Sequence, residues 1–420
     1  MPRATATRVG PRPLPLHLAT ALEGWMSSRA ALPLLRSGSI AWRPDLAPRA
    51  EALRQRIDGE RAEESPVGGV EGAAFDRAVD VEVRRRLAAF HEGVQAYRRH
   101  PYRREVEAPR ALWREGTTTL LDYGAAVPGA ARGRPVLFVP SLINRAYILD
   151  LSEKRSLVRG LGARGIRPLL VDWDAPGARE RRFTLTDYIA GRLERALSAA
   201  AGIAGGPIPV VGYCMGGLLA LALAARRPDQ VERLALLATP WDFHGDAWAR
   251  VQARAAAATL VLWSPLLETL GELPVDVVQA LFYTIDPFLV LRKFVNFARL
   301  DPSSARAAEF VALEDWLNDG VGLAAPVARE CLGGWYGENT PARTEWRIAG
   351  RAVDPADVVC PSLVVVPRND RIVPPASAEV LARIPGATTF APELGHIGMV
   401  VGARARETVW RPLAEWLSGG

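Results

Sequence analysis

The sequence predicts an α/β fold with a mostly parallel β-sheet. Short apolar runs rich in β-branched residues alternate with helical patterns through residues 135–239, and a further run begins at 361. Strands that are buried on both faces of a parallel sheet have this continuous apolar character. Helices predicted between them complete right-handed crossovers. The predicted strands are Pro135–Pro140, Pro168–Trp173, Pro207–Tyr213, Val231–Thr239 and Pro361–Val366, and the helices are Leu185–Ala200 and Met215–Ala225.

Other segments flank and interrupt this core. Residues 1–110 are predicted to form an N-terminal helical extension, because apolar residues recur there every three or four positions. Residues 111–240 and 356–420 supply the two parts of the core. Residues 241–355 are aromatic-rich and mostly helical in pattern, so we expect a cap; ligands in open α/β sheets bind outside the carboxyl ends of the strands, which favours a cap over the site. Helices are expected at Leu18–Leu35, Asp45–Ile57 and Phe75–Tyr97, a linker at Ser65–Gly72, and a hairpin at Ala111–Arg114 and Thr117–Tyr123.

Composition excludes several classes of protein. Of the 420 residues, 49% are hydrophobic and 23% are charged, as in ordinary globular proteins. No apolar run approaches the roughly 20 residues that span a bilayer, and no signal peptide is recognised, so a cytoplasmic protein is expected. The net charge of +6 comes from arginines spread along the chain, which predicts no nucleic-acid partner. The three cysteines, Cys214, Cys331 and Cys360, are too few and too scattered for a disulfide framework or a zinc site, so no metal is expected.

The strongest local signal is Gly-Tyr-Cys-Met-Gly-Gly at the predicted strand-to-helix junction. In a nucleophile elbow, small residues flank the nucleophile because the turn is tight, and Gly212, Gly216 and Gly217 fill those positions. Cys214 would stand at a helix N-terminus, where the dipole and the amides favour a thiolate. The amide of Met215 falls where an oxyanion donor is expected. A buried structural cysteine in a glycine-rich turn is the alternative.

Two further residues follow in the order of an α/β-hydrolase, which places nucleophile, acid and histidine in succession. Asp370 follows the last predicted strand, and His396 follows later in Gly-His-Ile-Gly, before the final helix. The sequence therefore predicts an α/β-hydrolase fold with Cys214, Asp370 and His396 as its catalytic triad. His244 is a competing histidine, but it precedes the acid and is interpreted as a cap or loop residue. A second oxyanion donor is expected from the loop after the Pro135–Pro140 strand.

These motifs together resemble polyhydroxyalkanoate synthases, most closely the short class III type that works with a partner subunit. They run in order from about Trp113 to the C-terminus. Those enzymes carry cysteine where lipases carry serine. The chain departs from the family pattern at Arg371, where many members have histidine, and in its longer N-terminal extension. The segments that carry the resemblance are GYCMGG, SLINRAYILDL, VDWDAPGARERRFTLTDYI, NDRIVPP, GHIG, LEDWLND and WYGENT.

The resemblance implies an acyltransferase that polymerises (R)-3-hydroxyacyl-CoA into polyhydroxyalkanoate and releases CoA. Cys214 would carry the acyl group as a thioester, His396 would be its base, and Asp370 would be the third member of the triad. The amides of Met215 and Ile143 would form the oxyanion hole. CoA is a leaving group of the substrate, so no cofactor is expected. The resemblance also implies a partner subunit or a homodimer, and a location at the surface of polyester granules.

Two other functions stay open. With water as the acceptor, the same triad would make a thioesterase or an intracellular polyhydroxyalkanoate depolymerase. Without catalysis, the chain would be a granule-associated binding protein that docks through its cap and N-terminal helices. The presence of all three triad residues disfavours this last alternative, because a non-catalytic protein has no need of them. Identification of the product as polyester or free acid separates the first two functions.

Overall fold

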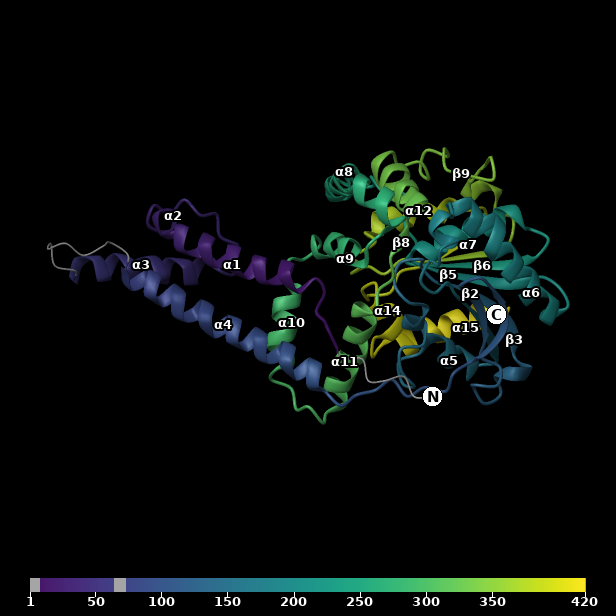
Figure 1. The fold of residues 1–420 in the computed structure, drawn as a ribbon, viewed down its shortest axis with the longest axis horizontal. Coiled ribbons are helices and arrows are strands. Elements are labelled where there is room, and N and C mark those ends of the chain that lie inside the picture. The colour runs from purple at the N-terminus through teal and green to yellow at the C-terminus, as the bar shows by residue number, and fades with distance from the viewer. Residues whose placement is uncertain (1–7, 64–72, 420) are drawn as a thin grey trace. The chain divides into compact units, whose positions relative to one another are not determined.

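The computed structural model describes residues 8–63 and 73–419, which group into two compact units (Figure 1). The larger unit contains Tyr102–Ile285 and the residues from Ala312 on. The smaller unit contains the described residues up to Pro101 together with Asp286–Val311. The predicted linker Ser65–Gly72 lies outside the described residues. Each unit has its own core, and the larger one carries the predicted site.

An eight-stranded sheet forms the centre of the larger unit, in the order β1-β2-β4-β3-β5-β6-β11-β12. β1 and β2 form the predicted hairpin, and β2 also pairs antiparallel with β4, whereas the pairs from β4 onward are parallel. This arrangement confirms the predicted fold class. β12 was not predicted, because three residues are too few to show a pattern. The strands are β1 Arg110–Glu115, β2 Thr118–Asp122, β3 Arg134–Val139, β4 Ile166–Asp172, β5 Ile208–Tyr213, β6 Val231–Leu237, β11 Ser362–Val365 and β12 Thr388–Phe390.

Helices cover both faces of this sheet, and each face has its own apolar cluster. Side chains alternate along β3: Leu137 and Val139 join the cluster with α6 and α7, whereas Val136 and Phe138 join the cluster with α5, α14 and α15. Successive residues of a strand point to opposite faces, so this alternation follows from the pleat. The helices are α5 Leu157–Gly162, the π-helical turn η4 Asp187–Leu193, α6 Glu194–Ala204, α7 Met215–Arg226, α13 Pro375–Glu379, α14 Gly398–Val401, the π-helical turn η8 Arg406–Trp410 and α15 Arg411–Leu417.

The predicted cap interval 241–355 is divided between the two units. Asp286–Val311, with α10, belongs to the smaller unit, and α11 includes residues of both units. The remaining cap elements belong to the larger unit, where α8 packs on η5. The elements of this interval are α8 Ala247–Leu270, β7 Glu272–Leu273, α9 Val275–Tyr283, α10 Leu289–Phe297, α11 Ala305–Asn318, β8 Leu323–Ala324, α12 Ala325–Arg329, the π-helical turn η5 Glu330–Gly337, β9 Arg347–Ile348 and β10 Arg351–Ala352.

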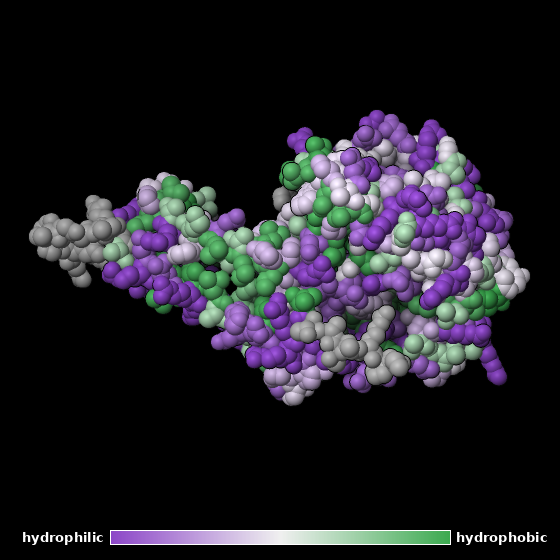
Figure 2. Space-filling view, in the orientation of Figure 1, coloured by the Kyte–Doolittle hydropathy of each residue, from purple (hydrophilic) through white to green (hydrophobic). Residues whose placement is uncertain are grey.

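Aromatic side chains hold the smaller unit together. The Phe294 ring on α10 meets Phe90 and Tyr97 of α4 edge-on, at centroid distances of 6.1 and 5.6 Å. Gly93 permits this approach, because a Cβ there would lie 2.1 Å from the Phe294 carbonyl oxygen. A groove of about 940 Å³ runs along α1, α4 and α10, and Figure 2 shows apolar side chains over this unit. The other helices are α1 Leu14–Ala30, α2 Leu32–Arg36, α3 Ala47–Glu63 and α4 Ala73–Arg99.

Three glycines allow β5 to turn directly into α7. A Cβ on Gly212 would lie 2.5 Å from the Gly217 Cα, and a Cβ on Gly217 would lie 1.8 Å from the Thr239 Oγ1. A Cβ on Gly216 would lie 2.1 Å from the carbonyl oxygen of Val139, at the end of β3. These contacts leave no room for a side chain, which explains the glycines of the predicted elbow.

Replacement of Gly216 by alanine should therefore destabilise the protein. A backbone oxygen has to move to accept the new methyl group, and overpacking of this kind costs about 1–3 kcal/mol. Gly202→Ala is the matched control, because a Cβ at this site in α6 meets nothing within 4 Å. Urea unfolding measures both variants. Equal free energies of unfolding for Gly216→Ala and the wild type would contradict the packing described here.

Candidate active site

Cys214 lies between β5 and α7 in a backbone conformation that non-glycine residues rarely adopt. Its φ and ψ are 55° and −128°. Two hydrogen bonds hold it there: its N–H donates to the Leu237 carbonyl at 2.9 Å, and its carbonyl accepts from the Gly217 N–H at 2.9 Å. Cys214 is partly exposed, although β5 and the first residues of α7 on either side of it are buried. This strained turn is the geometry of a nucleophile elbow.

The structure brings His396 and Asp370 together. His396 Nδ1 donates to Asp370 Oδ2 at 2.6 Å, and both side chains are buried. The other carboxylate oxygen, Oδ1, accepts from the backbone N–H groups of Ile372 at 2.8 Å and Val373 at 2.9 Å. Asp370 is therefore held from two sides. It fixes the imidazole with Nδ1 as a donor, which leaves Nε2 for the nucleophile.

His396 also interacts with Cys214, and this interaction changes the pKa of its ring. Burial by itself lowers the pKa of the His396 imidazole, but the charge and hydrogen bond of Cys214 and the Asp370 carboxylate outweigh burial and raise this pKa from 6.5 to about 10. Nearby negative charges favour the protonated ring. At neutral pH the His396 ring, which lies between Cys214 and Asp370, accordingly favours its protonated form.

Two tyrosines lie near His396 and Cys214. Tyr213 belongs to the segment GYCMGG and Tyr336 to WYGENT, and neither was assigned a role from the sequence. The ring of Tyr213 lies 5.1 Å from that of His396 between centroids, and its hydroxyl donates to the His396 carbonyl at 3.2 Å. Burial raises the pKa of Tyr213 well above its ordinary value, so it stays a donor. Burial also raises the pKa of Tyr336, and the charge of Cys214 adds to the effect. Tyr213 supports the loop that carries His396, and Tyr336 places a phenol ring from the cap near the thiol.

The predicted oxyanion donors differ in what they contact. Met215 is the first residue of α7, and the first amides of a helix have no acceptor within the helix. The amide of Ile143 lies in the loop Ser141–Asp150, named here the oxyanion loop, and donates to the Ser141 hydroxyl at 3.0 Å. The carbonyl of Pro140, just before this loop, accepts from the Trp173 indole at 3.0 Å. An acyl oxygen would have to take the place of the Ser141 hydroxyl to use Ile143.

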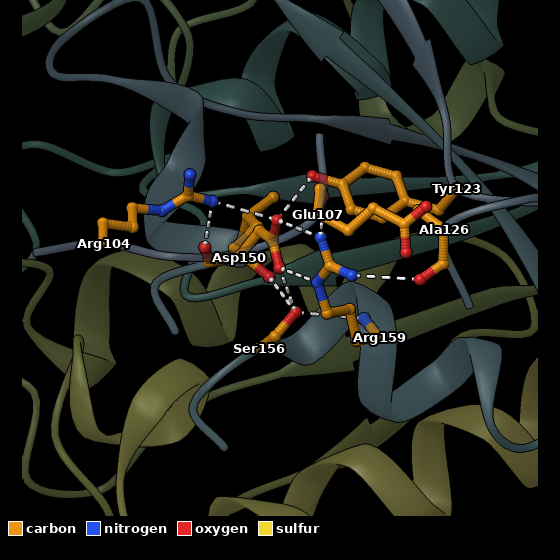
Figure 3. Close-up of polar contacts among 8 residues, drawn as sticks. Arg104, Glu107, Tyr123, Ala126, Asp150, Ser156 and Arg159 are labelled. Atoms are coloured by element: carbon orange, nitrogen blue, oxygen red, sulfur yellow. Dashed lines mark hydrogen bonds and ion pairs between the residues drawn. The ribbon is translucent and has the colours of Figure 1, made fainter. Parts of the chain in front are cut away.

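Asp150 fixes the end of the oxyanion loop (Figure 3). Its side chain is fully buried and accepts hydrogen bonds from Ser156 at 2.7 Å, Arg159 at 2.7 Å, Arg104 at 3.0 Å and Tyr123 at 3.1 Å. Both carboxylate oxygens are satisfied, which a buried charge requires. Asp150 belongs to the segment SLINRAYILDL, but its structural role could not be predicted from the sequence, because its partners come from distant segments.

Aromatic side chains of the predicted cap form a layer that includes Tyr336, whose phenol is close enough to Cys214 to feel its charge. The Phe243 ring meets Tyr336 at a centroid distance of 4.7 Å and Trp335 at 6.0 Å, and Trp335 in turn meets Trp346 at 5.2 Å. His244 belongs to this layer, because its Nε2 donates to the Tyr336 carbonyl at 2.7 Å. Its interpretation as a cap residue is thus consistent with the contacts.

The other two cysteines are also free thiols. Cys331 is buried in η5, and burial raises its pKa well above the ordinary value. Cys360 precedes β11, and its pKa is raised in the same direction by burial. A raised pKa keeps a thiol protonated and unreactive.

Comparisons with known proteins place this geometry in a family. Residues 134–259 match the model of the α/β-hydrolase fold. The chain is 30% identical to the poly(3-hydroxyalkanoate) polymerase subunit PhaC of Allochromatium vinosum over 327 residues, which cover 74% of this chain and 89% of that protein. It is also 30% identical to PhaC of Synechocystis sp., over 68% of this chain and 77% of that protein. An alpha/beta hydrolase fold protein from Nakamurella multipartita aligns with a TM-score of 0.42 and 20% identity, over 75% of this chain and 100% of that one.

The similarity to PhaC extends well beyond the segment that the general fold model matches. This chain belongs to the PhaC family of poly(3-hydroxyalkanoate) polymerases, within the α/β-hydrolase superfamily.

Proposed function

We propose that this chain polymerises (R)-3-hydroxyacyl-CoA into polyhydroxyalkanoate and carries the acyl group as a thioester on Cys214. The observation that supports this most directly is the 2.6 Å contact of His396 with Asp370 beside an elbow cysteine, in a chain of the PhaC family. A cysteine suits this chemistry, because attack on acyl-CoA exchanges one thioester for another at little free-energy cost. The substrate supplies CoA as its leaving group, and the proposal includes no cofactor or metal.

In the first step, the Cys214 thiolate attacks the carbonyl carbon of the acyl-CoA thioester. The amides of Met215 and Ile143 bind the oxyanion that forms, and each such donor is typically worth on the order of 10² to 10³ in rate. The bond between the carbonyl carbon and the CoA sulfur then breaks. The CoA sulfur takes the proton from His396 Nε2, so CoA leaves as a thiol and the acyl group stays on Cys214.

In the second step, His396 is neutral and acts as a general base. It takes the proton of a 3-hydroxyl group, whose oxygen attacks the Cys214 thioester. The new bond is an oxygen ester, and Cys214 leaves as a thiolate beside the reprotonated imidazole. Conversion of a thioester to an ester is downhill, so repeated cycles extend the polyester.

Water has to be kept from the thioester during this cycle, because hydrolysis would release free acid. The layer of Phe243, Trp335, Tyr336 and Trp346 reaches Cys214 through Tyr336 and supports a dry site. This layer favours transfer to a hydroxyl over hydrolysis.

The proposal also includes a location at the granule surface and a partner subunit or homodimer. The product is a water-insoluble polyester, which supports work at a granule surface. The relatives are named polymerase subunits, which supports a partner subunit or a homodimer. Within the described residues, no helix has the length and apolar character to cross a membrane.

Cys214→Ser should lower CoA release from 3-hydroxybutyryl-CoA by on the order of 10²-fold, and Cys214→Ala should abolish it, because a serine hydroxyl is a much weaker nucleophile without prior deprotonation. Cys360→Ser is the matched control, since that thiol is also partly exposed but lies before β11. Thiol release is measured with the product identified in the same tube. Near-normal turnover by Cys214→Ser would refute the covalent thioester, and free 3-hydroxybutyrate as sole product would identify a thioesterase.

The pH dependence of His396 gives a second test. Because its pKa in the folded protein, about 10, lies above 6.5, the imidazolium adds stability that is fully present below pH 6.5 and is lost as pH rises through about 10. Nitrogen NMR of labelled histidine should show a protonated His396 ring at pH 8, with assignment by His396→Gln. Cys214→Ala should lower the pH midpoint of the His396 titration, because a charge that favours the imidazolium is gone. A neutral His396 ring at pH 7 in the wild type would contradict the raised pKa of this histidine.

A further inference from the structure

Two residues of the segment LEDWLND contact the oxyanion loop from the cap side. The Trp316 indole Nε1 donates to the Arg145 carbonyl at 2.8 Å. The Tyr147 hydroxyl donates to Asp319 Oδ2 at 3.2 Å, and Arg145 Nε lies 3.6 Å from Asp319 Oδ1. Arg145 and Tyr147 therefore tie the middle of the oxyanion loop to Trp316 and Asp319.

A second cap element reaches the residue next to the predicted donor. The Gln279 side-chain amide of α9 lies 3.5 Å from Asn144 Oδ1 and donates to the Leu317 carbonyl at 2.9 Å. Asn144 has a φ of 66°, in the left-handed region. Gln279 thus links the turn at Asn144, directly after Ile143, to the same segment that carries Trp316.

The two ends of the loop are held by the core instead. The Pro140 carbonyl binds the Trp173 indole at one end, and the buried Asp150 binds two arginines at the other (Figure 3). The stretch that carries the Ile143 amide lies between these fixed ends. Its direction is set by the cap contacts at Asn144, Arg145 and Tyr147, together with an ion pair of Arg145 with Asp174, just after β4.

We propose that Trp316 and Asp319 are positioning residues for acyl transfer: by holding Arg145 and Tyr147, they set the direction of the Ile143 amide in the oxyanion hole. This inference rests on the proposed acyl transfer at Cys214. An oxyanion donor is effective only when its N–H lies about 2.7–3.1 Å from the developing charge, so a small rotation of the loop removes its contribution.

Local chemistry supports a lasting contact. Burial raises the pKa of the Tyr147 hydroxyl above its ordinary value, and the Asp319 charge adds to this, so the hydroxyl remains a donor across the working pH range. A Cβ on Gly320, the residue after Asp319, would lie 2.3 Å from Val275 Cγ2. The chain is therefore tightly packed against α9 where it leaves the segment.

The test compares two reactions of Cys214. Acylation by p-nitrophenyl butyrate builds an oxyanion and releases p-nitrophenolate, whereas alkylation by iodoacetamide builds none. Trp316→Phe replaces the indole with a phenyl ring and so removes the N–H donor. Tyr147→Phe removes only the hydroxyl. In both variants the acylation rate should fall by about 10-fold or more through kcat, with KM little changed, and the alkylation rate should stay at the wild-type value.

Trp410→Phe is the matched control. Its buried indole also donates to a backbone carbonyl, that of Val400 in α14 at 3.1 Å, but Trp410 is the last residue of η8 and, within the described part of the chain, has no hydrogen bond with the oxyanion loop. The Trp410→Phe variant should change neither the acylation rate nor the alkylation rate. The melting temperature of this variant shows the stability cost of losing a comparable indole hydrogen bond. Wild-type acylation in Trp316→Phe and Tyr147→Phe would overturn the inference.

Equal slowing of acylation and alkylation would also overturn the inference, because the damage would then lie at Cys214 or His396. If Trp316→Phe does not fold, the milder Tyr147→Phe decides the question. Failure of the proposed function has a different signature: wild-type Cys214 that is alkylated but is acylated by neither the ester nor 3-hydroxybutyryl-CoA.

Discussion

The strained turn at Cys214 is the constraint on which the site depends. A positive φ at a non-glycine residue costs about 1–3 kcal/mol and persists only where the surroundings impose it. Here β6 binds the Cys214 N–H from one side, and α7 packs so closely on β3 that Gly216 has no space for a methyl group. Cys214 is partly exposed directly after β5, whose residues are all buried. The close packing at Gly216 also brings the start of α7 against the end of β3, where the oxyanion loop begins.

Much of this could be predicted from sequence because a tight turn leaves its mark on residue type. Gly212 and Gly216 are required by close backbone contacts, and Gly217 by the Thr239 side chain, so the elbow and its cysteine can be recognised from residue type. Asp370 and His396 follow from the order in which the fold supplies its loops. The strands of the parallel sheet are visible because burial on both faces makes them continuously apolar.

Other features left no comparable mark. Helical periodicity shows that one side of a segment is buried but not against which partner, so the grouping of Asp286–Val311 with the N-terminal helices could not be read. Hydrogen bonds of the backbone carry no residue preference, which hid the contact of the Ile143 amide with Ser141. The partners of Asp150 are separated by up to 46 residues in sequence, so their meeting depends on tertiary structure.

In the proposed mechanism, the electrostatics of Cys214, Asp370 and His396 would let one histidine serve two opposite roles. The charge of Cys214 is among the causes that hold the His396 pKa near 10, and this favours an imidazolium that can protonate the departing CoA sulfur. Formation of the acyl thioester removes that charge, while burial of the ring continues to lower its pKa. The imidazole is therefore pushed toward its neutral form at the stage where a base is needed for the incoming hydroxyl. In the proposed cycle, the charge returns when the thiolate leaves and the imidazole retains its proton, so acylation itself would switch His396 between acid and base.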